Sequence, residues 1–189
     1  MEGKRTIVLC GFMGCGKSTV GPIVARLSGR RFLDMDAFIE QRAGKSISEI
    51  FASEGEARFR ELEREAAAEF ARERDLVVAA GGGALVQTAV AETLRAACAV
   101  VLLDAPLDEI RERLRGDTTR PLLQRPDRDE AMSALYAARL PVYRQAAHVA
   151  VHAAGTPEET AAAVLEAIGE AVGETPGETP ERPADEICH

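Results

Sequence analysis

The sequence predicts a three-layer α/β fold, in which helices cover both faces of an open, five-stranded parallel sheet. Five short, almost continuously apolar runs recur along the chain and alternate with longer segments of helical pattern. Such alternation is typical of sheets that are buried on both faces and joined by right-handed crossovers. A glycine-rich stretch that ends in Lys-Ser directly follows the first run, as in a phosphate-binding loop between a strand and a helix.

The length of the chain indicates one domain. The 189 residues carry a formal net charge of −8, but residues 170–189 alone hold six acidic side chains and one arginine. The rest is nearly balanced, which gives no support to nucleic-acid binding. We expect residues 1–169 to form the domain and residues 170–189, which repeat Gly-Glu-Thr-Pro, to be a disordered acidic tail.

The sequence has no apolar stretch of about 18 residues and no signal-peptide pattern. We therefore expect a soluble cytoplasmic protein that does not bind membranes. Thiols stay reduced in that compartment, so Cys10 and Cys98 are interpreted as small core residues rather than disulfide partners.

The predicted strands are the five apolar runs at residues 6–10, 31–35, 76–80, 99–103 and 148–152. In such a sheet ligands bind beyond the carboxyl ends of the strands. Two segments, 36–74 and 115–129, interrupt the regular alternation and could reach a ligand there.

The two interrupting segments differ in character. Residues 56–75 are rich in Ala, Glu and Arg, which predicts a long helix with three inward apolar side chains, Phe59, Leu62 and Phe70. Residues 115–129 hold two prolines, four arginines and three aspartates, which predicts a mobile polar loop.

The stretch Gly11-x4-Gly16-Lys17-Ser18 fits the phosphate-binding pattern G-x-x-x-x-G-K-[ST]. Its glycines let backbone N–H groups converge on an anion, Lys17 can reach the terminal phosphates, and the Ser18 hydroxyl can bind Mg²⁺. The chain contains no asparagine, so the guanine-reading motif N-K-x-D is excluded. Protein-kinase motifs are missing as well, which indicates a P-loop enzyme acting on a smaller molecule.

Asp34 and Asp36 end the second predicted strand and point to the same side if the strand stays extended. They could orient metal-bound water and accept a proton from an attacking hydroxyl. The alternative is a pair of solvated charges, or a helix N-cap at Asp36. The triple glycine Gly81–Gly83, which follows the third strand, could let a ligand lie against the backbone or could be a flexible turn.

Three arginines have neighbours that restrict them. Arg60 lies in EARFRELE, Arg120 in TTRPLL and Arg139 in AARLPVY. A restricted guanidinium can hold a carboxylate or phosphate with two hydrogen bonds. By default, each would be a solvated surface charge.

Taken together, the motifs GFMGCGKST, FLDMD, EQRAGKSISEIFASEGEARFRELE, AAGGGAL, TTRPLL and AARLPVY resemble shikimate kinase in order and spacing, over roughly residues 6–165. The resemblance implies transfer of the ATP γ-phosphoryl group to the 3-hydroxyl of shikimate, a step of aromatic amino-acid biosynthesis. It also implies a P-loop kinase fold with a helical substrate-binding segment, about residues 36–74, and a mobile lid, about residues 115–129.

The resemblance also implies roles at the nucleotide. Lys17 would hold the phosphates, Ser18 would bind one Mg²⁺ ion, and Asp34 would hold that ion through water. Adenine would lie between Arg113 and Pro157. The other nucleotide-binding residues of the P-loop would be Gly14, Cys15, Gly16 and Thr19.

At the acceptor, the resemblance implies that Asp36 binds the hydroxyl and acts as the base. Arg60 and Arg139 would bind the shikimate carboxylate beside a backbone wall of Gly81, Gly82 and Gly83. Arg120 would move in with the lid to neutralise the transferring phosphoryl group.

Two rival functions stay open at this stage. Gluconate kinase has a similar fold and also acts on a polyol carboxylate, although the paired aspartates, the triple glycine and the arginines favour shikimate. The other rival is a nucleotide-binding regulator that has lost turnover. We expect a monomer, because no exposed apolar helix face is evident.

Overall fold

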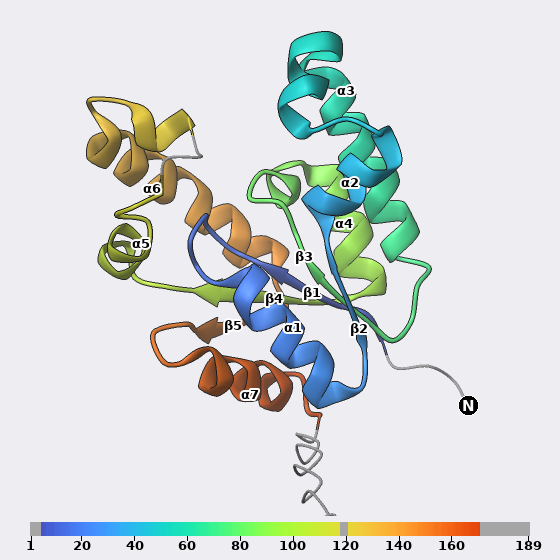
Figure 1. Ribbon diagram of the computed structural model, residues 1–189. Helices are drawn as coiled ribbons and strands as arrows, with labels where there is room; N and C mark the ends of the chain where they lie inside the picture. Colours follow the sequence, from blue (N-terminus) through green and yellow to red (C-terminus); the bar gives the residue numbers. More distant parts are fainter. Residues whose placement is uncertain (1–4, 118–120, 171–189) are drawn as a thin grey trace, which may run out of the picture.

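The structure is a computed structural model that describes residues 5–117 and 121–170. Its five strands form one parallel sheet in the order β2-β3-β1-β4-β5 (Figure 1). The strands are β1 (Ile7–Cys10), β2 (Arg31–Asp34), β3 (Leu76–Ala79), β4 (Ala99–Asp104) and β5 (Val149–His152). All five predicted strands and the parallel sheet are confirmed.

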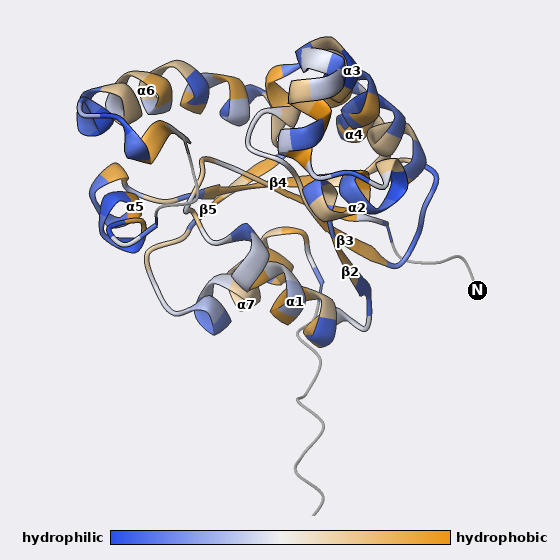
Figure 2. Ribbon diagram, turned by 45° about the horizontal axis from the view of Figure 1, so that its top comes forward, coloured by the Kyte–Doolittle hydropathy of each residue, from blue (hydrophilic) through white to orange (hydrophobic). Residues whose placement is uncertain are grey.

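Helices cover both faces of the sheet. The α-helices are α1 (Lys17–Ser28), α2 (Met35–Ala43), α3 (Ile47–Phe70), α4 (Thr88–Ala97), α5 (Leu107–Arg113), α6 (Arg128–Ala146) and α7 (Pro157–Ala167). The 3-10 helices are η1 (Ala84–Val86) and η2 (Pro121–Gln124). Helices α1 and α7 pack together on one face, whereas α3, α4 and α6 lie on the other (Figure 2). The predicted three-layer architecture is confirmed.

The core follows the centre of the sheet. Strands β1 and β3 are buried at every position, while the edge strands β2 and β5 are partly exposed. Cys10 and Cys98 are free and buried in this core, as predicted. Burial raises the pKa of the Cys10 thiol to about 12 and that of Cys98 to about 11, so both stay protonated at neutral pH.

The segment after β2 is helical, as the sequence predicts. Phe59, Leu62 and Phe70 are all buried on α3. The helix ends at Phe70, earlier than the predicted Asp75, and begins at Ile47, with a kink at Gly55. Gly55 has φ 84° and ψ 171°, a conformation open essentially to glycine alone.

The described residues of segment 115–129 are partly helical, whereas the sequence predicts a polar loop. Within it lie η2 and the first two residues of α6, which begins at Arg128. Leu123 of η2 is buried, and this apolar contact explains the extra turn. Residues 118–120, and with them Arg120, fall outside the described residues.

The carboxyl end of the described chain is tied to the domain. Arg30, whose side chain has no exposed surface, donates to both Glu170 carboxylate oxygens, at 2.7 and 2.6 Å. Glu170, the first residue of the predicted tail, thus contacts the folded body, while residues 171–189 fall outside the described residues. Across the described part of the chain, each helix is too short or too polar to cross a membrane.

Candidate active site

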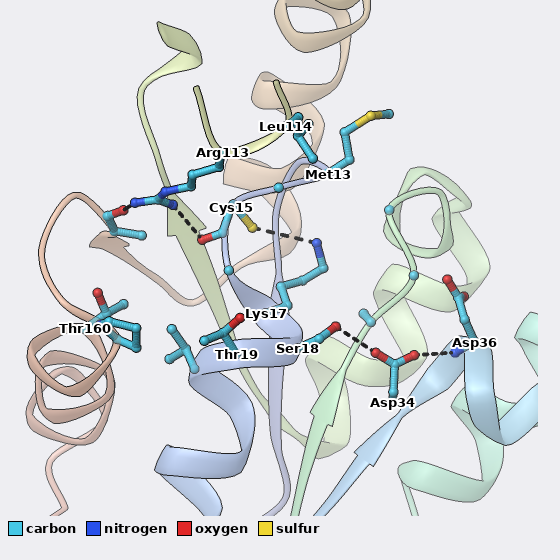
Figure 3. Close-up of a pocket in the computed structure, with 18 of the residues that line it drawn as sticks. Met13, Cys15, Lys17, Ser18, Thr19, Asp34, Asp36, Arg113, Leu114 and Thr160 are labelled. Carbon is cyan, nitrogen blue, oxygen red and sulfur yellow. Dashed lines mark hydrogen bonds between the residues drawn. The ribbon is translucent and has the colours of Figure 1, made fainter. Parts of the chain in front are cut away.

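A cavity of about 670 Å³ opens at the carboxyl edge of the sheet, beside the loop between β1 and α1 (Figure 3). The predicted site residues that line it are Gly14, Cys15, Gly16, Lys17, Ser18, Thr19, Asp34, Asp36, Gly81, Gly82, Gly83, Arg113, Arg139 and Pro157. Arg60 is not among the lining residues, although its Nη1 lies close to Gly83. The position of Arg120 is not described.

The loop before α1 has the backbone of an anion site. Gly14 and Gly16 have φ of 75° and 105°, which favour glycine, so the backbone can curve around a ligand. A Cβ on Gly14 would lie 2.9 Å from the Leu114 side chain. Helix α1 begins at Lys17, so its N-terminal N–H groups and its dipole face the cavity.

Lys17 folds back over this loop. Its ammonium donates to the carbonyls of Gly11, at 2.9 Å, and Phe12, at 3.2 Å, and lies 3.7 Å from Cys15 Sγ. Figure 3 shows the side chain arching towards Cys15. These are neutral acceptors, so a phosphate that entered the loop would compete well for the ammonium group.

Asp34 connects the loop to α2. It accepts a hydrogen bond from the Ser18 hydroxyl at 2.9 Å through Oδ2 and receives the backbone N–H of Asp36 at 3.0 Å through Oδ1 (Figure 3). Asp34, with extended backbone, is therefore the N-cap of α2. The expectation that the strand stays extended through Asp36 is wrong, because this cap begins the helix at Met35. Both carboxylates still line the same cavity.

The three glycines lie against three of the predicted substrate-binding side chains. A Cβ on Gly81 would lie 2.6 Å from Asp36 Oδ1, and one on Gly83 would lie 2.8 Å from Arg60 Nη1. A Cβ on Gly82 would lie 3.9 Å from Arg139 Nη1. The absence of side chains at Gly81 and Gly83 therefore gives Asp36 and Arg60 their room.

Arg60 is held by a buried carboxylate that the sequence reasoning missed. Glu63 is 1% exposed, accepts from Arg60 Nη1 at 2.7 Å, and accepts from Gln87 Nε2 at 2.6 Å. Its Oε1 lies 3.6 Å from the Cβ position of Gly81. Burial raises the pKa of Glu63, and the bond to Arg60 opposes that rise. The i,i+3 spacing from Arg60 was the available signal.

The Gly82 carbonyl accepts two hydrogen bonds from α6. One comes from Arg139 Nη1 at 3.2 Å and the other from the hydroxyl of Tyr143. Tyr143 is 1% exposed, and burial raises its pKa to about 12, so the hydroxyl is a donor at neutral pH. The sequence reasoning missed Tyr143, although it lies one helical turn beyond Arg139.

At the opposite end of the cavity, Arg113 bridges two loops. Its guanidinium donates to the carbonyl of Ala153 at 2.8 Å and to that of Cys15 at 3.4 Å (Figure 3). Pro157, the first residue of α7, lines the same cavity. The two predicted adenine contacts thus lie beside one space.

Sequence comparisons agree with the motifs. The family model described as shikimate kinase matches residues 13–169. A shikimate kinase from Geobacter sulfurreducens is 51% identical over 142 residues, covering 75% of this chain and 78% of the relative. One from Mycobacterium avium is 47% identical over 144 residues, covering 76% and 81%.

Solved structures agree as well. A shikimate kinase from Acinetobacter baumannii in complex with shikimate has a TM-score of 0.81 at 38% identity, covering 87% of this chain and 93% of that one. A gluconokinase from Sinorhizobium meliloti has a TM-score of 0.53 at 18% identity, covering 89% and 93%. The second likeness is one of fold alone.

Proposed function

The chain belongs to the shikimate kinase family, and we propose that it transfers the γ-phosphoryl group of ATP to the 3-hydroxyl of shikimate, giving shikimate 3-phosphate and ADP. The observation that carries this function is the wall of Gly81–Gly83. Asp36, Arg139 and Arg60 lie against its three glycines, at one end of the cavity that holds the phosphate-binding loop. Donor and acceptor can therefore meet in one space.

ATP is proposed to bind along the loop before α1. Lys17 would leave the Gly11 and Phe12 carbonyls for the β- and γ-phosphates, because an anion is the stronger acceptor. The backbone from Gly14 to Thr19 would surround the phosphates, and adenine would lie between Arg113 and Pro157. Transfer then depends on positioning and on stabilising charge at the γ-phosphate.

The residues beside the loop fit one Mg²⁺ ion. The Ser18 hydroxyl and the Asp34 carboxylate are hard oxygen donors that meet at 2.9 Å, and Mg²⁺ takes few protein ligands in phosphate sites. We propose that Ser18 binds the ion directly and that Asp34 binds it through water. When bound, the ion would neutralise phosphate charge.

Shikimate is proposed to lie on the glycine wall. Its carboxylate would be gripped by the guanidinium groups of Arg60 and Arg139, which approach the wall from α3 and α6. Its 3-hydroxyl would face Asp36, the general base, which is held next to Gly81. Glu63 would keep Arg60 oriented towards the wall through the bond at 2.7 Å.

Closure would complete the site. We propose that residues 115–129 act as a lid, that Arg120 enters with it to stabilise the transferring phosphoryl group, and that residues 36–74 bind the acceptor. A closed lid excludes water, which competes with shikimate as acceptor.

The oligomeric state and the compartment of the enzyme are also proposals. We propose a monomeric domain of residues 1–169 in the cytoplasm, where ATP is plentiful. Large exposed apolar side chains in the described residues are few, namely Phe51 and Val86, and a monomer is consistent with this. Light scattering coupled to gel filtration measures the oligomeric state, and a dimer mass would contradict this proposal.

A coupled assay of ADP release tests the function. The protein is given ATP and Mg²⁺ with shikimate, with gluconate, or with neither. We expect turnover that depends on shikimate. Preference for gluconate would assign the rival kinase activity, and ATP binding without turnover on either compound would favour a non-catalytic regulator.

A further inference from the structure

Tyr143 is buried behind the glycine wall and takes no direct part in lining the cavity. Its hydroxyl nevertheless donates to the carbonyl of Gly82, the middle residue of the wall. Arg139, one turn earlier on α6, donates to the same oxygen at 3.2 Å. One backbone carbonyl is therefore shared by a guanidinium that faces the cavity and a phenol that does not.

We propose that Tyr143 is a positioning residue that holds the Gly82–Gly83 peptide in place, so that Arg139 can bind the substrate carboxylate without releasing the wall. This inference rests on the proposed binding of shikimate at Gly81–Gly83. Because the peptide unit is planar, fixing the Gly82 oxygen also fixes the direction of the Gly83 N–H.

Three consecutive glycines need such support from outside. Glycine loses more conformational freedom on ordering than any other residue. Asp36, Arg60 and Arg139 all lie close to the wall, but each is proposed to engage the substrate. The carbonyls of Gly81 and Gly83 accept the backbone N–H groups of Ala84 and Val86. The Gly82 carbonyl instead depends on side chains, and Tyr143 is the donor to it that lies outside the cavity.

The chain supplies a matched control for the hydroxyl. It has two tyrosines and no tryptophan, and both tyrosines lie on α6. Tyr136 also donates to a backbone carbonyl, that of Ala105 at 3.1 Å, away from the glycine wall. Tyr143→Phe and Tyr136→Phe therefore each remove one phenol-to-carbonyl hydrogen bond and keep the ring.

Steady-state kinetics on the full chain separates the two bonds. For Tyr143→Phe we expect the KM for shikimate to rise about fivefold or more, the cost of losing one buried hydrogen bond. The KM for ATP should stay near wild type, and Tyr136→Phe, which also loses one phenol-to-carbonyl hydrogen bond, should keep the wild-type KM for shikimate. An unchanged KM for shikimate in Tyr143→Phe, or an equal rise in the KM for ATP, would overturn the assignment.

A second measurement does not require Tyr143 to be changed. In Tyr136→Phe, Tyr143 is the sole tyrosine, so its emission reports on its own hydrogen bond. We expect shikimate to change this emission, because Arg139 moves its charge towards the carboxylate. Constant emission at shikimate concentrations that calorimetry shows to be saturating would overturn the proposal, even if Tyr143→Phe fails to fold. A wild-type protein that phosphorylates no shikimate would instead overturn the proposed function.

Discussion

Asp36 Oδ1 lies 2.6 Å from the point that a Cβ would occupy on Gly81, closer than a Cβ can approach an oxygen. The proposed base therefore stands in space that exists because residue 81 has no side chain. The Gly81 backbone has negative φ, since it is absent from the glycines in the left-handed region. Alanine can adopt this conformation, so a substitution there tests the steric relation alone.

We expect Gly81→Ala to push the Asp36 carboxylate out of place and to lower kcat for shikimate about a hundredfold, since small displacements of a reacting group are costly. ATP binding, measured with a fluorescent nucleotide, should be retained. Gly82→Ala should lose much less, because its Cβ would lie at an ordinary 3.9 Å from Arg139 Nη1. Equal losses in both variants would argue against the steric explanation.

Removing the proposed base tests its chemistry. Asp36→Asn keeps the size of the side chain, so ATP and shikimate should still bind. Turnover should fall about 100- to 10,000-fold, the range for loss of a general base. Single-turnover kinetics with saturating substrates measures this. A wild-type rate would remove Asp36 from the mechanism.

The Arg60 network predicts a difference between its two acidic partners. Glu63 is 1% exposed and also bonds Gln87, whereas Glu56 is 65% exposed. We expect Glu63→Gln to raise the KM for shikimate about tenfold, because Arg60 loses a charge-assisted bond in a desolvated place. Glu56→Gln, which removes a solvated partner of the same guanidinium, should leave KM unchanged. A similar KM in both variants would show that burial of Glu63 has no part in binding.

The Arg30 and Glu170 pair predicts where the folded body ends. Arg30 is fully buried, so Glu170→Ala would leave a guanidinium in the interior without its carboxylate. We expect the free energy of unfolding to fall by about 3 kcal/mol, measured by urea denaturation. Glu166→Ala, at an exposed position on α7, should change it little. Equal stability of the two variants would indicate that the domain ends before Glu170.

Much of the fold follows from local patterns. The short apolar runs predicted all five strands, because a parallel strand covered on both faces needs an apolar side chain at almost every position. The phosphate-binding loop followed from fixed spacing alone. The grouping of Asp34, Asp36 and the glycines in one cavity followed from their places at the carboxyl ends of strands. The place of Arg139, which lies outside the inserted segments, followed only from the resemblance to shikimate kinase.

What the sequence did not reveal depends on tertiary contacts. Glutamate is an exposed residue by default, and Glu63 is buried because Gln87, 24 positions later, and Arg60 both satisfy it. Nothing in the sequence distinguishes Tyr143 from an ordinary buried aromatic residue, because the bond from its hydroxyl to Gly82 depends on the tertiary fold. Asp34 ends its strand because its side chain caps α2. Strand periodicity alone does not show whether the chain after Asp34 stays extended or begins a helix.

His148 predicts a pH dependence of stability. Its Nδ1 accepts the backbone N–H of Val100 at 3.1 Å, between β4 and β5, and this bond requires the neutral ring. Burial, and then the positive charges of Arg95 and Arg5, lower the pKa of His148 below 6.5. A lowered pKa means that the folded state disfavours the proton. The stabilisation is therefore complete above pH 6.5 and is lost as the pH falls through the folded-state pKa.

His148→Asn separates the bond from the titration, because the amide oxygen can accept from Val100 without gaining a proton. Thermal unfolding from pH 7.5 to pH 5 should show a smaller loss of stability in this variant than in the wild type. His152→Asn, at the exposed end of β5, should keep the wild-type pH dependence. If His148→Asn loses as much stability on acidification as the wild type, groups other than His148 carry the acid sensitivity.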